Sequence, residues 1–133
     1  MAHDRFLPLA SSVYRAKGWD NVTRAIMLAG KALTRPDAQW LTDNHLVDGC
    51  ESQVWLVIDN GHIVAWSDAK IVRGVVALVV EKANTLNMAD MASFDFATYL
   101  AELGLERHLS QSRADGINQV IRQLRHLAAR QLA

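Results

Sequence analysis

Apolar residues spaced three and four positions apart predict a first helix between about Trp19 and Leu33. Asp20 or Asn21 could cap its start with a side-chain oxygen. Pro36 lies just past its end and cannot continue a helix. The apolar stripe that defines this helix consists of Trp19, Val22, Ile26, Ala29 and Leu33.

The pattern then changes from helical spacing to runs of β-branched and aromatic residues. Residues 53–59 read as a strand, and residues 62–66 read as its antiparallel partner. Asn60 and Gly61 between them are a strong hairpin signal, because both tolerate a positive φ. A third strand at residues 45–48 would complete a small antiparallel sheet and leave Cys50 in a turn at its mouth.

Three further helices are predicted after the strands. Ser67 and Asp68 look like the N-cap of a buried helix over residues 69–83. A shorter helix spans about residues 95–103, and Gly104 can close it in the left-handed conformation. The last helix starts after Ser112. Its apolar stripe is Ile117, Val120, Ile121, Leu124 and Leu127, and its polar side carries Arg122, Arg125, His126 and Arg130.

The start of the last helix shows capping-box spacing between Ser112 and Asp115, with Asp in place of the usual Glu. Grouped strands with helices segregated around them predict an α+β fold, in which a small three-stranded antiparallel sheet packs with helices. Because the chain has no internal repeat, low-complexity tract or Gly/Ser linker, residues 1–133 should form a single domain.

Composition excludes several classes of function. With 14 basic and 14 acidic side chains, the chain lacks the cationic surplus typical of nucleic-acid binding. The longest apolar run, residues 75–80, is far shorter than the ~20 residues that span a bilayer. One cysteine excludes an intrachain disulfide, and the scattered histidines have no metal-ligand spacing. No secretory signal is visible, so the default location is the cytoplasm.

Cys50, the single cysteine, is the main candidate for chemistry. A free cysteine is often a small buried hydrophobe, but this one lies among the polar and turn residues Asp48, Gly49 and Glu51. The two neighbouring carboxylates disfavour a thiolate. A cation such as Arg113 or Arg73, a histidine, or a partner protein must therefore activate the thiol.

Three blocks in register resemble the SufE/CsdE family of sulfur acceptor proteins. Residues 49–56, GCESQVWL, resemble the pattern G-C-[QE]-[SN]-x-V-W, and residues 109–117, LSQSRADGI, resemble L-[ST]-x-S-R-x-x-G-[LI]. Residues 67–74, SDAKIVRG, resemble D-S-[DE]-x-x-I-[VT]-[KR]-G, although Trp66 replaces its first position. Trp19 and residues 30–33 resemble W-x-x-[KR]-Y…L-G-[KR]-x-L, from which Val22 and Thr23 depart.

This resemblance implies a SufE/IscU-like fold and a role as acceptor and activator for a pyridoxal-phosphate (PLP)-dependent cysteine desulfurase of the SufS/CsdA type. Cys50 would carry the persulfide and relay its sulfur to an iron–sulfur scaffold or another acceptor. The PLP belongs to the partner, so the chain needs no cofactor of its own and is not a stand-alone enzyme. The residues implied at the partner contact are Glu51, Ser52, Gln53, Asp68 and Arg113.

Each of these partner-contact residues also has a purely structural reading. Glu51, Ser52 and Gln53 could simply form a solvated turn, Asp68 could be a helix cap, and Arg113 could be a solvated side chain.

Three other functions remain open at this stage. A scaffold that holds a cluster itself needs about three cysteines, which argues against that reading. An independent thiol-dependent enzyme needs a base beside Cys50, and no histidine stands in a recognisable nucleophile motif. A non-catalytic binding or regulatory partner would carry Cys50 only incidentally.

Overall fold

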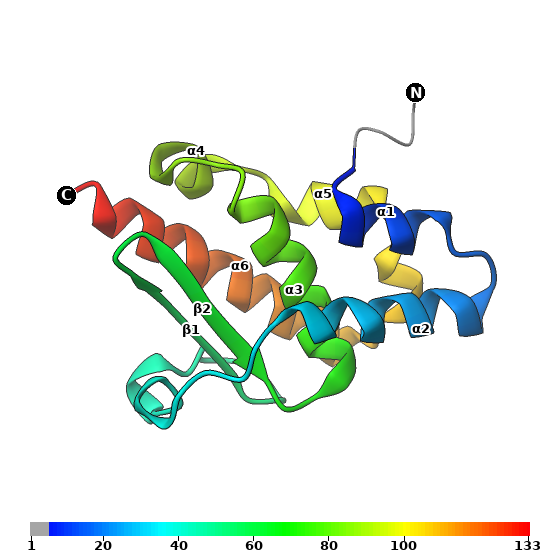
Figure 1. The fold of residues 1–133 in the computed structure, drawn as a ribbon, viewed down its shortest axis with the longest axis horizontal. Coiled ribbons are helices and arrows are strands. Elements are labelled where there is room, and N and C mark those ends of the chain that lie inside the picture. Colours follow the sequence, from blue (N-terminus) through cyan, green and yellow to red (C-terminus); the bar gives the residue numbers. More distant parts are fainter. Residues whose placement is uncertain (1–5) are drawn as a thin grey trace.

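The computed structural model describes residues 6–133, which contain six α-helices and one two-stranded antiparallel sheet (Figure 1). The predicted α+β class is therefore confirmed. Short 3₁₀ turns connect these elements at Gly30–Ala32, Ala38–Trp40, Asp43–His45 and Leu105–His108. The elements in chain order are α1 Pro8–Arg15, α2 Trp19–Ala29, β1 Val54–Asp59, β2 His62–Ser67, α3 Lys70–Ala83, α4 Met88–Ser93, α5 Phe96–Glu102 and α6 Gln111–Gln131.

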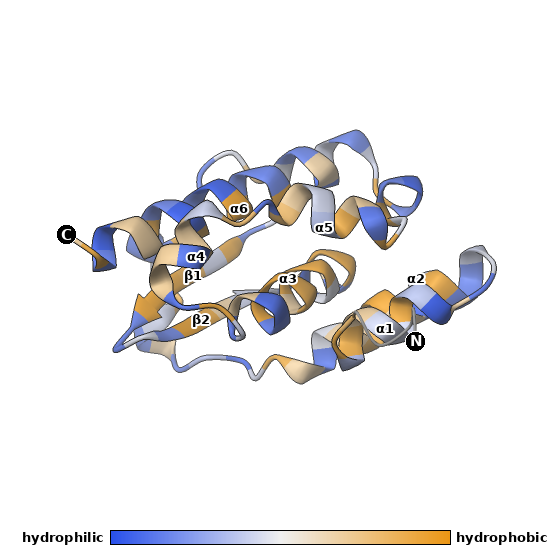
Figure 2. Ribbon diagram, turned by 90° about the horizontal axis from the view of Figure 1, so that it is seen from above, coloured by the Kyte–Doolittle hydropathy of each residue, from blue (hydrophilic) through white to orange (hydrophobic). Residues whose placement is uncertain are grey.

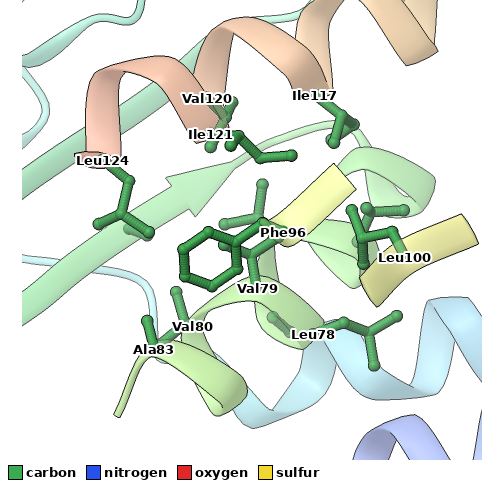
Figure 3. Close-up of a cluster of buried hydrophobic side chains, with 14 of the residues drawn as sticks. Leu78, Val79, Val80, Ala83, Phe96, Leu100, Ile117, Val120, Ile121 and Leu124 are labelled. Carbon is green, nitrogen blue, oxygen red and sulfur yellow. The ribbon is translucent and has the colours of Figure 1, made fainter. Parts of the chain in front are cut away.

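Helix α3 is the centre of the molecule. It lies between α1 and α2 on one side and α5 and α6 on the other, and it is the most continuously apolar helix (Figure 2). A helix that is apolar on all sides must be buried, and residues 74–80 of α3 are all buried. Figure 3 shows the aromatic ring of Phe96 between Val79 and Val80 of α3 and Ile121 and Leu124 of α6. Burial of such a ring contributes about 1.5–3 kcal/mol.

The predicted hairpin forms between β1 and β2, with Asn60 and Gly61 as its turn. Trp55 lies opposite Trp66, and Asp59 opposite His62. The turn between the strands places Asn60 at φ +50° and Gly61 at φ +81°. Both central residues thus adopt the positive φ expected of an Asn-Gly hairpin turn.

The predicted third strand at residues 45–48 is wrong. Only Leu46 forms an isolated bridge, to Trp55, and the backbone N–H of Val47 donates to the carbonyl of Val54 at 2.8 Å. A 3₁₀ turn ends at His45, and Gly49 turns the chain away at φ +83°. Too few extended residues remain between these two turns to form a strand, so the sheet has two strands.

Two helix starts differ from the prediction. Helix α2 begins after Gly18, so Asp20 and Asn21 lie inside its first turn and do not cap it. Helix α3 begins after Ala69, which has no side-chain oxygen to act as a cap. Ser67 and Asp68 both precede the N-cap position: Oγ of Ser67 accepts a hydrogen bond from the backbone N–H of Ala69 at 3.2 Å, and Oδ1 of Asp68 accepts from the indole Nε1 of Trp66 at 3.1 Å.

The start of α6 also needs correction. Ser110, not Ser112, is the N-cap, and its Oγ accepts a hydrogen bond from the backbone N–H of Arg113 at 3.3 Å. Asp115 accepts from the side-chain Nε2 of Gln111 at 2.8 Å. The helix therefore begins two residues earlier than predicted, because the chain holds two serines at alternate positions and the first of them is the cap.

Helices α1 and α4 were not predicted. The carboxylate of Glu81 on α3 holds the start of α1 by accepting from the backbone N–H groups of Leu9 at 2.7 Å and Ala10 at 3.1 Å. Trp19, which we placed on the apolar face of α2, is 61% exposed and stacks on His108 with 4.6 Å between ring centroids. Within residues 6–133, no helix combines the length and the apolar character that crossing a membrane requires.

Candidate functional site

Cys50 lies in a short loop, residues 48–53, which we call the cysteine loop. The bond between the Val47 N–H and the Val54 carbonyl closes this loop at its base. The thiol of Cys50 donates a hydrogen bond to the carbonyl of Gly116 on α6, with 3.3 Å between sulfur and oxygen. The cysteine loop thus lies against the first turns of α6, and Cys50 is partly exposed rather than buried in the core.

A cavity of about 300 Å³ opens beside the thiol, and we call it the cysteine pocket. The cysteine loop, the first strand, α3 and the start of α6 all contribute to it. Most of its lining side chains are polar, which is unusual for a cavity that merely reflects imperfect core packing. The lining residues are Cys50, Glu51, Ser52, Val54, Val72, Ser110, Ser112, Arg113 and Gly116.

The surroundings of Cys50 favour the protonated thiol. Partial burial raises the pKa of Cys50 above its ordinary value, and the negative charge of Asp48 raises it further. The resting protein therefore holds a thiol rather than a thiolate at neutral pH. A thiol in this state is a poor nucleophile until its surroundings change.

The structure separates the two arginines that could activate the thiol. Arg113 lines the cysteine pocket. Arg73 is held at the start of α3, where its Nε donates to the carbonyl of Ser67 at 2.7 Å and its guanidinium stacks over the ring of Trp66 at 4.1 Å. The lining of the cysteine pocket includes no histidine, so no imidazole base stands beside the thiol there.

Comparison with known proteins decides the family. Residues 8–128 match SufE, the Fe-S metabolism associated domain. The chain belongs to the SufE family. It is 31% identical over 118 residues to an uncharacterized SufE-like protein of Haemophilus influenzae, in an alignment that covers 85% of this chain and 94% of that protein. The SufE match associates the chain with iron–sulfur metabolism.

The structure brings together some, but not all, of the predicted site residues of this SufE-family chain. Glu51, Ser52 and Arg113 line the cysteine pocket with Cys50. Gln53 is exposed at the end of the cysteine loop and does not line the pocket. Asp68 also lies outside the lining, and its carboxylate holds the Trp66 indole.

Sequence reasoning missed the two serines of the cysteine pocket. Ser110 and Ser112 both lie at its edge, with 3.4 Å between their hydroxyl oxygens. Both belong to the block 109–117 that resembles the SufE pattern, so that block marked them. We read Ser112 only as a helix cap. Across residues 6–133, no three side chains of His, Cys, Asp or Glu gather closely enough to hold a metal ion.

Proposed function

We propose that Cys50 accepts a sulfane sulfur atom from a PLP-dependent cysteine desulfurase in the cytoplasm and relays it toward iron–sulfur cluster assembly. The observation that carries this proposal is the placement of the single cysteine. Its sulfur lies partly exposed at a polar pocket of about 300 Å³, where a terminal sulfur atom has room beside it. Membership of the SufE family supplies the link to iron–sulfur metabolism.

The reaction is an exchange between a thiol and a persulfide. The Cys50 thiolate attacks the terminal sulfur of a persulfide held on a cysteine of the desulfurase, and a new S–S bond forms. The S–S bond of the donor persulfide breaks at the same time. The inner sulfur, which belongs to the desulfurase cysteine, leaves as a thiolate and takes up the proton lost by Cys50. No net oxidation occurs, so the step needs no cofactor on this chain, and the PLP stays with the desulfurase.

Activation of the thiol belongs to the complex and not to the isolated chain. Asp48 and partial burial hold the pKa of Cys50 above its ordinary value, so docking must supply a cation or remove the thiol from the Gly116 carbonyl. Arg113 is the nearest candidate within the chain, because it lines the same pocket. This requirement protects the resting cysteine from oxidants until the donor arrives.

The partner contact is proposed to surround the pocket mouth. Glu51 and Ser52 lie beside Cys50 at this mouth, and exposed Gln53 and Asp68 extend the surface beyond it. Arg113 offers a planar set of donors suited to a carboxylate of the desulfurase. A downstream scaffold would receive the sulfur after the desulfurase has left, since both need access to the same atom.

Sulfur transfer is tested by mixing the reduced protein with a cysteine desulfurase and L-cysteine under anaerobic conditions. Mass spectrometry should find one added sulfur atom, localised by peptide mapping to Cys50. Cys50→Ser should carry no added sulfur and should no longer raise desulfurase turnover. Thr85→Ala, on an exposed residue outside the cysteine pocket, serves as the matched control and should behave as wild type.

Two results would contradict the proposal. An active desulfurase that leaves Cys50 unmodified would exclude the acceptor role. If Cys50→Ser still stimulated the desulfurase fully, the chain would be a binding partner in which the cysteine is incidental.

A further inference from the structure

A groove runs along the side of α6 that faces away from the cysteine loop, and we call it the α6 groove. Its first part, about 230 Å³, lies between α5, the turn Leu105–His108 and the first half of α6. Its floor is apolar: Leu105, Ile117 and Ile121 lie buried beneath it, and Ala97, Ala101 and Leu109 are its more accessible apolar residues. Glu106 supplies the one carboxylate that lines this part.

The second part of the α6 groove is basic. It is a hollow of about 530 Å³ next to Ala92 of α4, and Arg122, Arg125 and His126 line it. Arg125 is fixed in place, because its Nε donates to the carbonyl of Ala92 at 3.0 Å. This bond uses one of the five N–H donors of the guanidinium.

The two parts of the α6 groove are continuous. Asn118 and Ile121 line both of them, so the apolar floor leads directly into the basic end. The residues along α6 run from Ala114 to His126, which corresponds to about 18 Å of helix length. A partner helix of about three turns would match this length.

The α6 groove is separate from the cysteine pocket. Gly116 and Gln119 of α6 lie next to the cysteine loop. Asn118 lies two residues beyond Gly116, and Ile121 lies two residues beyond Gln119. Because two residues correspond to about 200° around a helix, the groove lies on the opposite side of α6 from the cysteine loop. In Figure 1 the hairpin lies along one side of α6, and helices α4 and α5 lie along its other side. A partner in the groove therefore leaves Cys50 accessible.

We propose that the α6 groove binds an amphipathic helix of a partner protein, whose apolar face covers Ala97, Ala101 and Leu109 and whose acidic residues meet Arg122, Arg125 and His126. Charge complementarity favours this occupant, because Arg122, Arg125 and His126 can bind carboxylates and the apolar floor can bind leucine-like side chains. The carboxylate of Asp95 offsets part of the charge of Arg125, so Arg122 should contribute most to this preference. A nucleic acid fits less well, since its backbone would have to cross an apolar floor beside the carboxylate of Glu106.

The direction of the partner helix also follows. Acidic residues are stabilising in the first turn of a helix, where they complement the positive end of its dipole. The N-terminal turn of the partner therefore lies at Arg122 and Arg125, and its C-terminal turn lies near Glu106. A basic residue in that last turn would add a favourable contact.

The test uses two synthetic peptides of about 14 residues. Both carry leucines at helical spacing, one has glutamates in its first turn, and the other has lysines there. Each is titrated into isotope-labelled, reduced, full-length protein while the amide NMR spectrum is followed. The glutamate peptide should shift amides within residues 105–126 and bind about tenfold more tightly than the lysine peptide.

Variants locate the contact. Arg122→Glu should remove most of that tenfold preference, and adding Arg125→Glu should reverse it. Ala101→Gln, on an exposed residue at the groove wall, should weaken both peptides. Arg24→Glu on the exposed side of α2 is the matched charge control and should change nothing. Cys50→Ser should bind as wild type, which keeps this test independent of sulfur transfer.

Four outcomes would overturn the proposal: equal affinity for the two peptides, no binding at about 1 mM peptide, amide shifts outside the groove, or equally tight binding of a single-stranded oligonucleotide. The last would identify a general polyanion surface. Because Arg125 also ties α4 to α6, the single Arg122→Glu variant with an unchanged melting temperature decides the charge preference.

Discussion

The two ends of the β1–β2 hairpin are built in different ways. At one end, Asn60 and Gly61 form the turn with φ values of +50° and +81°. A Cβ placed on Gly61 would meet no atom within 4 Å. This end is exposed, and its shape follows from two adjacent residues that tolerate positive φ.

At the other end, the cysteine loop takes its place from α6. Gly49 adopts φ +83°, and a Cβ placed there would lie 3.2 Å from Cγ of Gln119. The thiol of Cys50 bonds to the carbonyl of Gly116, which is 66 positions away in the sequence. Residues far apart in the chain therefore determine where this loop lies.

The difference separates a turn that is fixed by its own two residues from a loop that is placed by a distant helix. The Asn60-Gly61 turn keeps the strands in register whatever happens at the cysteine. Beyond the Val47–Val54 bond at its base, the cysteine loop is held to α6 by the hydrogen bond of the Cys50 thiol to Gly116, and the desulfurase proposed above would need to replace only contacts of this size. A segment held by a few weak contacts belongs to the less stable part of a fold.

Among the variants that test this comparison, Gly49→Ala should lower the free energy of unfolding the most. A left-handed conformation costs a residue with a Cβ about 1–2 kcal/mol, and the contact with Gln119 adds up to about 1 kcal/mol. We expect a loss of about 1–3 kcal/mol in the free energy of unfolding, measured by urea denaturation. Alkylation of Cys50 by iodoacetamide should become faster, because the displaced thiol is less buried.

The Gln119→Ala background separates the two causes of this loss. Removing Cγ and the amide of Gln119 removes the steric part, so Gly49→Ala should then cost only the backbone part. An equal loss in both backgrounds would show that α6 does not constrain the cysteine loop.

Gly61→Ala should have a smaller effect. Only the positive φ of +81° opposes the new methyl group, so we expect a loss of about 1–2 kcal/mol in urea denaturation. The alkylation rate of Cys50 should stay at the wild-type value, since the turn lies at the opposite end of the hairpin. A changed rate would mean that the two ends are coupled.

The distinction between structure set by adjacent residues and structure set by distant residues also explains which features the sequence could predict. The hairpin, the buried α3 and the apolar stripe of α6 follow from local patterns, and all are confirmed. Helix α1 has Pro8 in its first turn, a local sign of a helix start that sequence reasoning did not use, but it has no side-chain cap of its own. Its first N–H groups depend instead on Glu81, about 70 positions away, which neighbouring residues could not reveal.

The candidate site likewise has one part that is visible in the sequence and another part that only the fold assembles. Cys50 and its flanking residues stand together in the sequence, so resemblance to the SufE pattern found them. The pocket itself joins the cysteine loop to Ser110, Ser112 and Arg113 of a distant helix start. Only the fold brings these together, and the exposure of Trp19 shows that periodicity alone does not identify the buried face of a short helix.

Asp48→Asn should have a still smaller, purely electrostatic effect. Removing the charge lowers the pKa of the Cys50 thiol toward its ordinary value, although partial burial still keeps it raised. We expect alkylation at pH 7.5 to be faster than in wild type, because a larger share of the Cys50 thiol is then ionised. Asp43→Asn, an exposed carboxylate change in the preceding 3₁₀ turn, is the control and should leave the rate unchanged.

The pH dependence of the free energy of unfolding tests independently whether Asp48 raises the pKa of Cys50. Because the folded-state pKa of Cys50 is raised, the folded state binds the thiol proton more tightly than the unfolded chain. This stabilisation is complete below the unfolded value of about 8.5 and disappears as the pH rises through the folded value. The loss at alkaline pH should be smaller in Asp48→Asn than in wild type, and absent in Cys50→Ser.

The smallest effect should come from Gly116→Ala, which sharpens the contrast with Gly49. A Cβ on Gly116 would lie 3.6 Å from Sγ of Cys50, an ordinary van der Waals contact, and the residue has helical geometry within α6. Alanine favours a helix interior over glycine by about 1 kcal/mol, so stability should rise by at most that amount. The carbonyl that accepts the thiol hydrogen bond is unchanged, and the alkylation rate should stay within about twofold of wild type. A marked loss of stability would instead mean that the cysteine loop approaches α6 more tightly than 3.6 Å allows.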